Sequence, residues 1–297
     1  MSFSATDAAF EGFRVVRRRP IVAVMWGLVY LVLLLAVFGL FADRWAGIMA
    51  AAEALERSSS PSEADIQALG FAYMGLLSWL VPLGLVFGAV LSAAVARAVL
   101  RPEESRWGYL RLGMDEVRVL VVSLVVSVII GLASGVGLFA ASALFGLGMA
   151  GGQAIWFLVA VIAALAAAAL VVWLAVKLSL AVPITVDRRR IALGASFAAT
   201  RGRFWPLLGM AVIAIVMSII VSLLGGMITA AVELSVGGVR ALGRLDGLPT
   251  GEILAQVWPG LLVWSVVNAF LSALQMAVIY APFSAAWRDI RGLSASI

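Results

Sequence analysis

The chain has 297 residues, of which 64% are hydrophobic and 12% are charged, with a formal net charge of +5 at pH 7. Soluble domains are typically about 45–50% apolar and about 25% charged, so this composition excludes an ordinary globular protein and indicates an integral membrane protein. Cysteine and histidine are both absent, which excludes disulfides, thiol nucleophiles, Ser-His-Asp triads, and zinc or haem sites built on those residues.

Six apolar stretches are each long enough to cross the hydrocarbon core of a bilayer as a helix, which needs about 20 residues. The expected spans cover residues 21–42, 71–100, 117–149, 154–182, 205–232 and 261–287. The first stretch follows Arg17, Arg18 and Arg19, as a signal peptide would, but it exceeds the roughly 7–15 apolar residues of a signal sequence. We therefore expect a retained first helix and a single all-α polytopic membrane domain over residues 1–297.

The basic residues indicate how the spans are oriented. If the six spans alternate in direction, 17 of the 21 lysine and arginine residues fall on one side of the membrane and four on the other. Basic residues near the ends of spans collect in the cytoplasm. The sequence therefore predicts an even number of spans with the N- and C-termini both cytoplasmic. Heavy use of Ala, Gly, Val and Arg is typical of a GC-rich genome, so the expected location is a bacterial inner membrane.

Short amphipathic segments precede the first, third and fifth spans. Near the N-terminus, Ser4 and Asp7 form the pattern of a helix cap, and Phe10, Phe13 and Val16 follow at helical spacing. The comparable apolar positions before the third and fifth spans are Trp107, Leu110, Met114, Val117, Leu193, Phe197 and Phe204. Arginines flank each segment, which is typical of short helices that lie in the membrane interface.

The same order of elements occurs three times along the chain. Each basic amphipathic segment leads into an out-and-back pair of spans, which predicts three parallel two-helix hairpins over roughly residues 1–100, 101–183 and 184–297. Residues 127–135 of the third span also parallel residues 218–226 of the fifth. The alternative is that apolar segments of low complexity match by chance. Repeats running in the same direction differ from the inverted repeats of many secondary transporters.

A series of short motifs in the C-terminal half carries a family resemblance. It consists of Pro183-Ile-Thr-Val-Asp187, a basic run, Ala195-Ser-Phe197, and Thr200-Arg-Gly-Arg-Phe-Trp-Pro206. The chain in this respect resembles a broad group of bacterial six-helix proteins that includes the membrane domain attached to some glycerophosphodiester phosphodiesterases. In the fused proteins the phosphodiesterase chemistry lies in a separate soluble domain. The resemblance therefore implies an architecture and no catalytic residues.

Four polar residues share one face of the sixth span, because they recur at spacings of three, four and three residues. They are Ser265, Asn268, Ser272 and Gln275. Amide side chains are costly in hydrocarbon unless they find polar partners. This polar stripe therefore forms either hydrogen bonds with neighbouring helices or the lining of a polar cavity or lipid-headgroup site.

Arginine clusters beside amphipathic segments are typical of surfaces that contact anionic lipid headgroups. The candidates for this contact are Arg17, Arg18, Arg19, Lys177, Arg188, Arg189, Arg190, Arg201 and Arg203. The alternative is that these residues only set the topology. Lys177, the only lysine, lies near the end of its span, close enough for its ammonium group to reach the interface. Nucleic-acid binding is not expected, because the interleaved Trp and Phe side chains should insert into the membrane.

No catalytic, metal-binding or cofactor-binding motif is present, and no Asp or Glu lies deep in an expected span. The sequence therefore predicts a non-enzymatic protein that binds or organises lipids or supports a membrane complex. The alternative is a transporter or channel for a small or lipidic solute. Stripes of small residues, such as Gly84, Gly88, Ser92 and Ala96, suit close packing within one bundle or a seam between copies. The expected partners are anionic membrane lipids, and a second copy or another membrane protein is the further candidate.

Overall fold

The computed structural model describes residues 4–58, 62–235 and 250–292. Within those ranges the chain is helical and contains no strand. Six helical segments of the described chain are long and apolar enough to cross a membrane, as the sequence predicted. Their bounds are Pro20–Leu40, Glu63–Leu100, Arg106–Gly151, Ala154–Arg188, Phe204–Ala231 and Leu262–Ile290. The chain is thus a multi-pass helical membrane protein.

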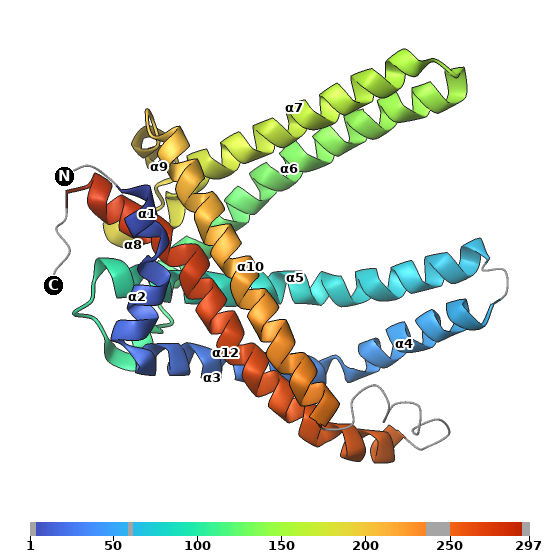
Figure 1. Cartoon of the computed structure of the whole chain (residues 1–297), viewed down its shortest axis with the longest axis horizontal. Helices are drawn as coiled ribbons and strands as arrows, with labels where there is room; N and C mark the ends of the chain where they lie inside the picture. The colour runs from blue at the N-terminus through green and yellow to red at the C-terminus, as the bar shows by residue number, and fades with distance from the viewer. Residues whose placement is uncertain (1–3, 59–61, 236–249, 293–297) are drawn as a thin grey trace. The chain divides into compact units, whose positions relative to one another are not determined.

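The helices follow one another along the chain as Figure 1 shows. They are α1 (Ala5–Ala9), α2 (Glu11–Arg18), α3 (Pro20–Leu40), α4 (Ala42–Arg57), α5 (Glu63–Leu100), α6 (Met114–Gly151), α7 (Ala154–Leu178), α8 (Ala181–Arg188), α9 (Leu193–Ala199), α10 (Phe204–Ser235) and α12 (Thr250–Ile290), with a 3-10 turn, η1 (Arg106–Tyr109), between α5 and α6. At 1.5 Å per residue, the 38 residues of α5 extend about 57 Å, whereas the hydrocarbon core is about 30 Å thick. Helices of this length tilt or continue beyond the hydrocarbon core.

Sequence signals mark several helix starts. Ser4 caps α1, where its hydroxyl accepts a hydrogen bond from the Asp7 backbone N–H at 3.3 Å. Pro20 begins α3 at a position where a helix leaves the N–H group unpaired. Before α5, the Ser62 hydroxyl accepts from the Asp65 N–H at 3.2 Å, and the Asp65 carboxylate accepts from the Ser62 N–H at 3.0 Å. This reciprocal pair is a capping box, which satisfies two backbone donors.

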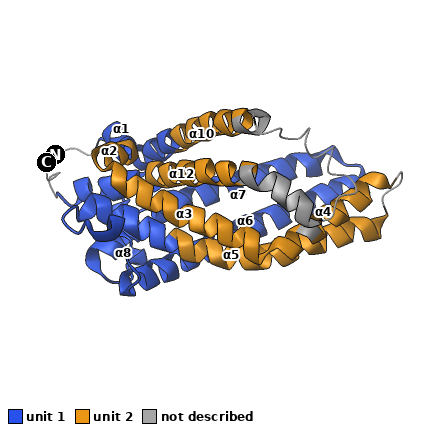
Figure 2. Ribbon diagram, turned by 90° about the horizontal axis from the view of Figure 1, so that it is seen from below, with its two compact units in different colours: residues 1–11, 89–214, 280–297 blue, residues 12–88, 215–279 orange. Residues whose placement is uncertain are grey.

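The chain divides into two compact units, which Figure 2 shows in different colours. Unit 1 comprises residues 1–11, 89–214 and 280–297, and unit 2 comprises residues 12–88 and 215–279. Each unit gathers segments that are far apart in the sequence, so α5, α10 and α12 contribute to both. The three hairpin repeats expected from the sequence have other boundaries and stay a prediction.

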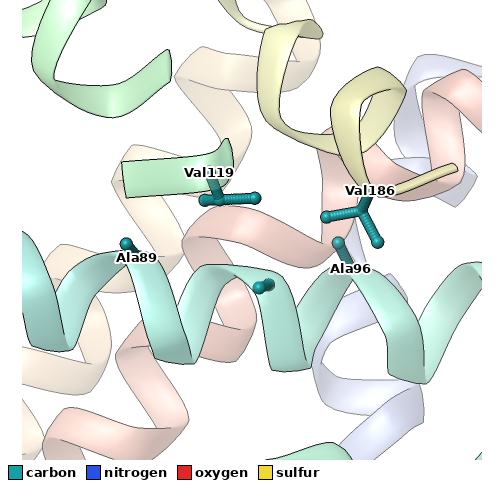
Figure 3. Close-up of a cluster of buried hydrophobic side chains, with 5 residues drawn as sticks. Ala89, Ala96, Val119 and Val186 are labelled. Atoms are coloured by element: carbon teal, nitrogen blue, oxygen red, sulfur yellow. The ribbon is translucent and has the colours of Figure 1, made fainter. Parts of the chain in front are cut away.

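Unit 1 has a small core of alanine and valine side chains where α5, α6 and α8 meet. Ala89, Ala93 and Ala96 lie on one face of α5, Val119 comes from α6, and Val186 comes from α8. Figure 3 shows the two valine side chains directed toward the alanines of α5. Alanines spaced by three and four residues let helices approach closely. This core places the C-terminal end of α5 beside the ends of α6 and α8.

Helices α6 and α7 form an antiparallel hairpin that is prominent in Figure 1. Gly152 ends α6 with a φ of 63°, a left-handed conformation that glycine adopts without steric cost. Beside this turn, the rings of Phe145 and Phe157 meet edge to face, with their centroids 5.1 Å apart. Many apolar side chains of the hairpin are exposed, such as Phe139 at 76%. Such exposure suits a hairpin surrounded by lipid tails.

In unit 2, the second N-terminal helix packs against protein at Gly12. A Cβ atom built on Gly12 of α2 would lie 2.5 Å from the Ala277 carbonyl oxygen and 2.6 Å from the Val278 Cα, both in α12. Val15, one turn further along α2, is also buried. The sequence predicted that this amphipathic helix lies in the membrane interface. The structure shows that α2 also contacts α12 at Gly12, and the interfacial position of the helix stays a prediction.

Two expected elements differ from the structure. The segment before the third span was expected to be an amphipathic helix, but residues 107–109 form a 3-10 turn with φ values of 54°, 64° and 64°. The Trp107 side chain is 74% exposed there, so this apolar side chain lies at the surface on a turn and not on a helix. The expected fourth span is also interrupted, because α7 ends at Leu178 and α8 begins at Ala181. Pro183 explains this break, since it has no N–H to bond the carbonyl four residues earlier.

Candidate functional site

A buried ion pair joins α5 to α6 in unit 1. The side chains of Arg97 and Glu116, which are 1% and 7% exposed, pair with each other. Arg97 Nη1 also donates to the Tyr109 carbonyl oxygen at 2.6 Å, and the Tyr109 hydroxyl donates to the Pro102 carbonyl at 2.9 Å. The guanidinium group thereby holds the left-handed turn against the end of α5. Because burial of a charge is costly unless the charge is paired, Arg97 has a structural role here.

Arg101 connects the end of α5 with the end of α8. Its Nη2 donates to the carbonyl oxygens of Val186 at 2.8 Å and Asp187 at 3.1 Å. The last carbonyls of a helix have no partner within the helix and carry the negative end of its dipole. Arg101 therefore stabilises the C-terminal turn of α8, from which the next functional side chains project.

The Glu104 carboxylate lies close to three arginine side chains. Its carboxylate lies 2.8 Å from Arg111 Nη1, 3.5 Å from Arg189 Nη2 and 3.7 Å from Arg101 Nη1. Arg189 has a φ of 51°, a left-handed conformation that residues other than glycine rarely adopt. This carboxylate offsets the charge of Arg189, although the arginine side chain is 63% exposed.

Asp187 fixes the end of α12 beside α8. Its carboxylate is 9% exposed, accepts a hydrogen bond from Trp287 Nε1 at 2.9 Å, and pairs with Arg291. Arg188 lies over the Trp287 ring, with its Cζ 5.4 Å from the ring centroid, which is the geometry of a cation–π interaction. The indole is therefore held at its edge by Asp187 and at its face by Arg188.

A groove of about 430 Å³ opens beside this arrangement. It is lined by Arg188, Ala195, Ala198, Ala199, Trp287, Ile290 and Arg291, which come from α8, α9 and the end of α12. Arg291 is paired with Asp187, whereas no carboxylate in the described part of the chain lies within 4 Å of the Arg188 guanidinium. The groove thus combines small apolar side chains with an excess of positive charge.

The other predicted lipid-contact residues lie in varied settings. Five of them are exposed and form no ion pair within the described ranges: Arg17, Arg18, Arg190, Arg201 and Arg203. Arg19 is half-buried, and Arg203 Nη1 donates weakly to the Ala199 carbonyl at 3.4 Å. Lys177 is also half-buried, with its Nζ 6.0 Å from the centroid of the Trp173 ring. Of the nine candidates, the structure therefore places only Arg188 at the groove.

The polar stripe of α12 lies in unit 2. Gln275 Nε2 donates to the hydroxyl of Ser222 on α10. Ser265 is fully buried, and its hydroxyl has no hydrogen-bond partner in the part of the chain that the structure describes. Asn268 and Ser272 are half-buried. One member of the stripe thus bonds a neighbouring helix, and the choice between packing and a polar cavity stays open for the others.

Sequence reasoning missed three residues that shape the groove and its surroundings: Glu104, Asp187 and Trp287. Asp187 stands in the motif that carries the family resemblance and directly precedes the arginine run, which is the one local signal for it. Trp287 gave no such signal, because its hydrogen-bond partner lies 100 residues earlier in the chain.

We expect Trp287→Phe to lower the free energy of unfolding by about 1–2 kcal/mol, because it removes a donor from a buried carboxylate and keeps the aromatic face under Arg188. Thermal unfolding of the purified protein in detergent measures this effect. Trp79→Phe is the matched control, since Trp79 is 57% exposed on α5. An equal change in both variants would contradict the role assigned to the Trp287 N–H.

Comparisons of the chain with protein families, curated protein sequences and solved structures find no match. The likeness to the six-helix group, which rests on short motifs, therefore stays a prediction. The membrane-spanning helices and the groove at the end of α8 are the features from which a function is inferred.

Proposed function

We propose that the chain is a non-enzymatic protein of a bacterial inner membrane that binds and organises anionic lipids at its basic helix ends. The observation that carries this proposal is the groove, where the cations Arg188 and Arg291 lie beside small apolar side chains. A phospholipid has the complementary pattern, with an anionic phosphate next to an apolar body. Arginine binds phosphate well because its planar guanidinium offers several N–H donors in a fixed arrangement.

In this proposal the basic helix ends face the cytoplasm, whose leaflet carries anionic lipids. Each exposed basic residue near that surface contributes about 1 kcal/mol of attraction. Arg17, Arg18, Arg201 and Arg203 would supply this general attraction, since each is exposed and pairs with no carboxylate of the described chain. Arg188 would add a defined contact. If the arginines only set the topology, their positive charge would be enough. The groove is an additional feature that topology does not require, and it supports lipid binding.

The proposal is tested by reconstituting the full-length protein in lipid nanodiscs that contain equal amounts of phosphatidylglycerol and phosphatidylcholine. Native mass spectrometry then counts the lipids that stay bound after release from the disc. We expect phosphatidylglycerol to be enriched about fivefold, which corresponds to about 1 kcal/mol of preference. Enrichment should fall in high salt, because salt screens exposed charges. Equal retention of the two lipids would overturn the proposal.

A further inference from the structure

We infer that the groove lined by α8, α9 and the end of α12 holds a single phospholipid whose phosphate is a diester with one negative charge, as in phosphatidylglycerol. The inference rests on the proposed function and deepens it, because it names the site and the charge of the ligand. It follows from the donors, the charges and the shape of the groove.

Arg188 supplies the donors that the phosphate would meet. Its guanidinium carbon lies over the Trp287 ring, 5.4 Å from the ring centroid, and a guanidinium carries five N–H donors. None of these N–H groups bonds another residue of the described chain. The Trp287 ring is itself held by the Asp187 carboxylate. An arginine held in this way loses less conformational freedom on binding than a free surface arginine would.

The charges around the groove favour a monoanion. Arg188 and Arg291 contribute two positive charges, and Asp187, which pairs with Arg291, contributes one negative charge. Arg189 is directed elsewhere, because its guanidinium pairs with Glu104. The remaining single positive charge matches a phosphodiester. A phosphomonoester approaches two negative charges at neutral pH and would leave one of them unbalanced.

The shape of the groove provides for the apolar part of the ligand. Ala195, Ala198 and Ala199 of α9 are small, and Ile290 completes the apolar lining. A volume of about 430 Å³ is within the usual range of sites for small ligands, about 300–1,000 Å³. The groove therefore suits the headgroup and the adjoining glycerol region, while the acyl chains would stay in the membrane. The mixed lining distinguishes it from a site for a free inorganic anion, which needs no apolar wall.

The first test compares Arg188→Gln with Arg190→Gln in the same nanodiscs. Both changes remove one positive charge from neighbouring positions, but only Arg188 lines the groove. We expect Arg188→Gln to reduce the retention of one phosphatidylglycerol molecule about tenfold, because a charged hydrogen-bonding contact is lost. Arg190→Gln should change retention by less than about twofold, as expected for an exposed charge.

A second pair of variants keeps the charge and alters only the shape. Ala198→Leu fills the groove from an exposed position, so the protein should still fold. Gly194→Leu, on the same helix, adds its side chain where nothing beyond the adjoining backbone of its own helix lies within 4 Å of the new Cβ. We expect Ala198→Leu to lose the retained lipid and Gly194→Leu to keep it. Loss in neither variant, or equal loss in both, would overturn the assignment of the lipid to the groove.

The possible outcomes distinguish a failure of the groove site from a failure of the proposed function. If phosphatidylglycerol is still preferred over phosphatidylcholine but Arg188→Gln and Arg190→Gln behave alike, the groove site is wrong and the proposed function stands. If neither lipid is preferred, both fail. Phosphatidic acid retained more strongly than phosphatidylglycerol would overturn the charge argument. Release of the lipid by millimolar glycerol phosphate or inorganic phosphate would show that the groove takes a soluble phosphate instead.

Discussion

Arg97→Met should lower the free energy of unfolding by about 3–5 kcal/mol, the largest effect that we expect from any single change in this chain. The substitution keeps most of the buried volume but removes the only charge that pairs with the Glu116 carboxylate in the described part of the chain. It also removes the hydrogen bond from Arg97 to the Tyr109 carbonyl. Unfolding can be followed in detergent by the loss of helical circular dichroism with increasing denaturant.

Two further variants show whether the buried pair causes this effect. Replacing both partners, as Arg97→Met with Glu116→Leu, should recover most of the loss, because no unpaired charge remains buried. Arg57→Met is the control, since Arg57 pairs with Glu53 on the exposed surface of α4, where the two side chains are 72% and 59% exposed. An exposed pair contributes about 0.3–0.5 kcal/mol. If Arg97→Met cost no more than Arg57→Met, the buried pair would not have the structural role described here.

Gly12→Leu should destabilise the protein by about 3 kcal/mol, at the upper end of the usual cost of overpacking. The new Cβ would lie 2.5 Å from the Ala277 carbonyl oxygen and 2.6 Å from the Val278 Cα. These are backbone atoms of a long helix, so they cannot move aside as the end of a flexible side chain can. We therefore expect α2 to separate from α12, and faster amide hydrogen exchange across α2 would report this separation.

Gly39→Leu serves as the comparison for this variant. Gly39 also lies in a helix, α3, but nothing beyond the adjoining backbone of that helix lies within 4 Å of a Cβ built there. Leucine has a higher helix propensity than glycine, so this change should be neutral or stabilising by up to about 1 kcal/mol. Unchanged stability and unchanged exchange in Gly12→Leu would contradict the close contact between α2 and α12.

The spanning helices could be predicted well because the bilayer requires long apolar runs. The first span was expected over residues 21–42, and α3 covers Pro20–Leu40. Local apolar spacing was misleading at Trp107, where the expected helix is a left-handed turn. That turn is held by the buried Arg97 guanidinium through the Tyr109 carbonyl, a contact between segments that no local pattern contains.

The candidate site was predictable in its residue types but not in its arrangement. The run Arg188–Arg190 looks uniform in the sequence, and the structure separates its members. Arg188 lies over Trp287, Arg189 pairs with Glu104, and Arg190 is exposed. Their partners lie in helices and turns distant in the sequence, so only the folded chain distinguishes them. The lipid proposal depends on this separation, because it assigns the binding to one arginine of the three.

The central claim is that the arginine-bearing helix ends lie on the cytoplasmic side of a membrane that the chain crosses six times. Because the sequence contains no cysteine, single cysteines can be labelled without background. Arg190→Cys and Gly151→Cys stand beyond opposite ends of α7. In intact bacterial cells, an impermeant maleimide should label the cysteine at 151 and should reach the one at 190 only after the membrane is opened. Labelling of both from outside, or of 190 alone, would contradict the orientation on which the lipid-binding account depends.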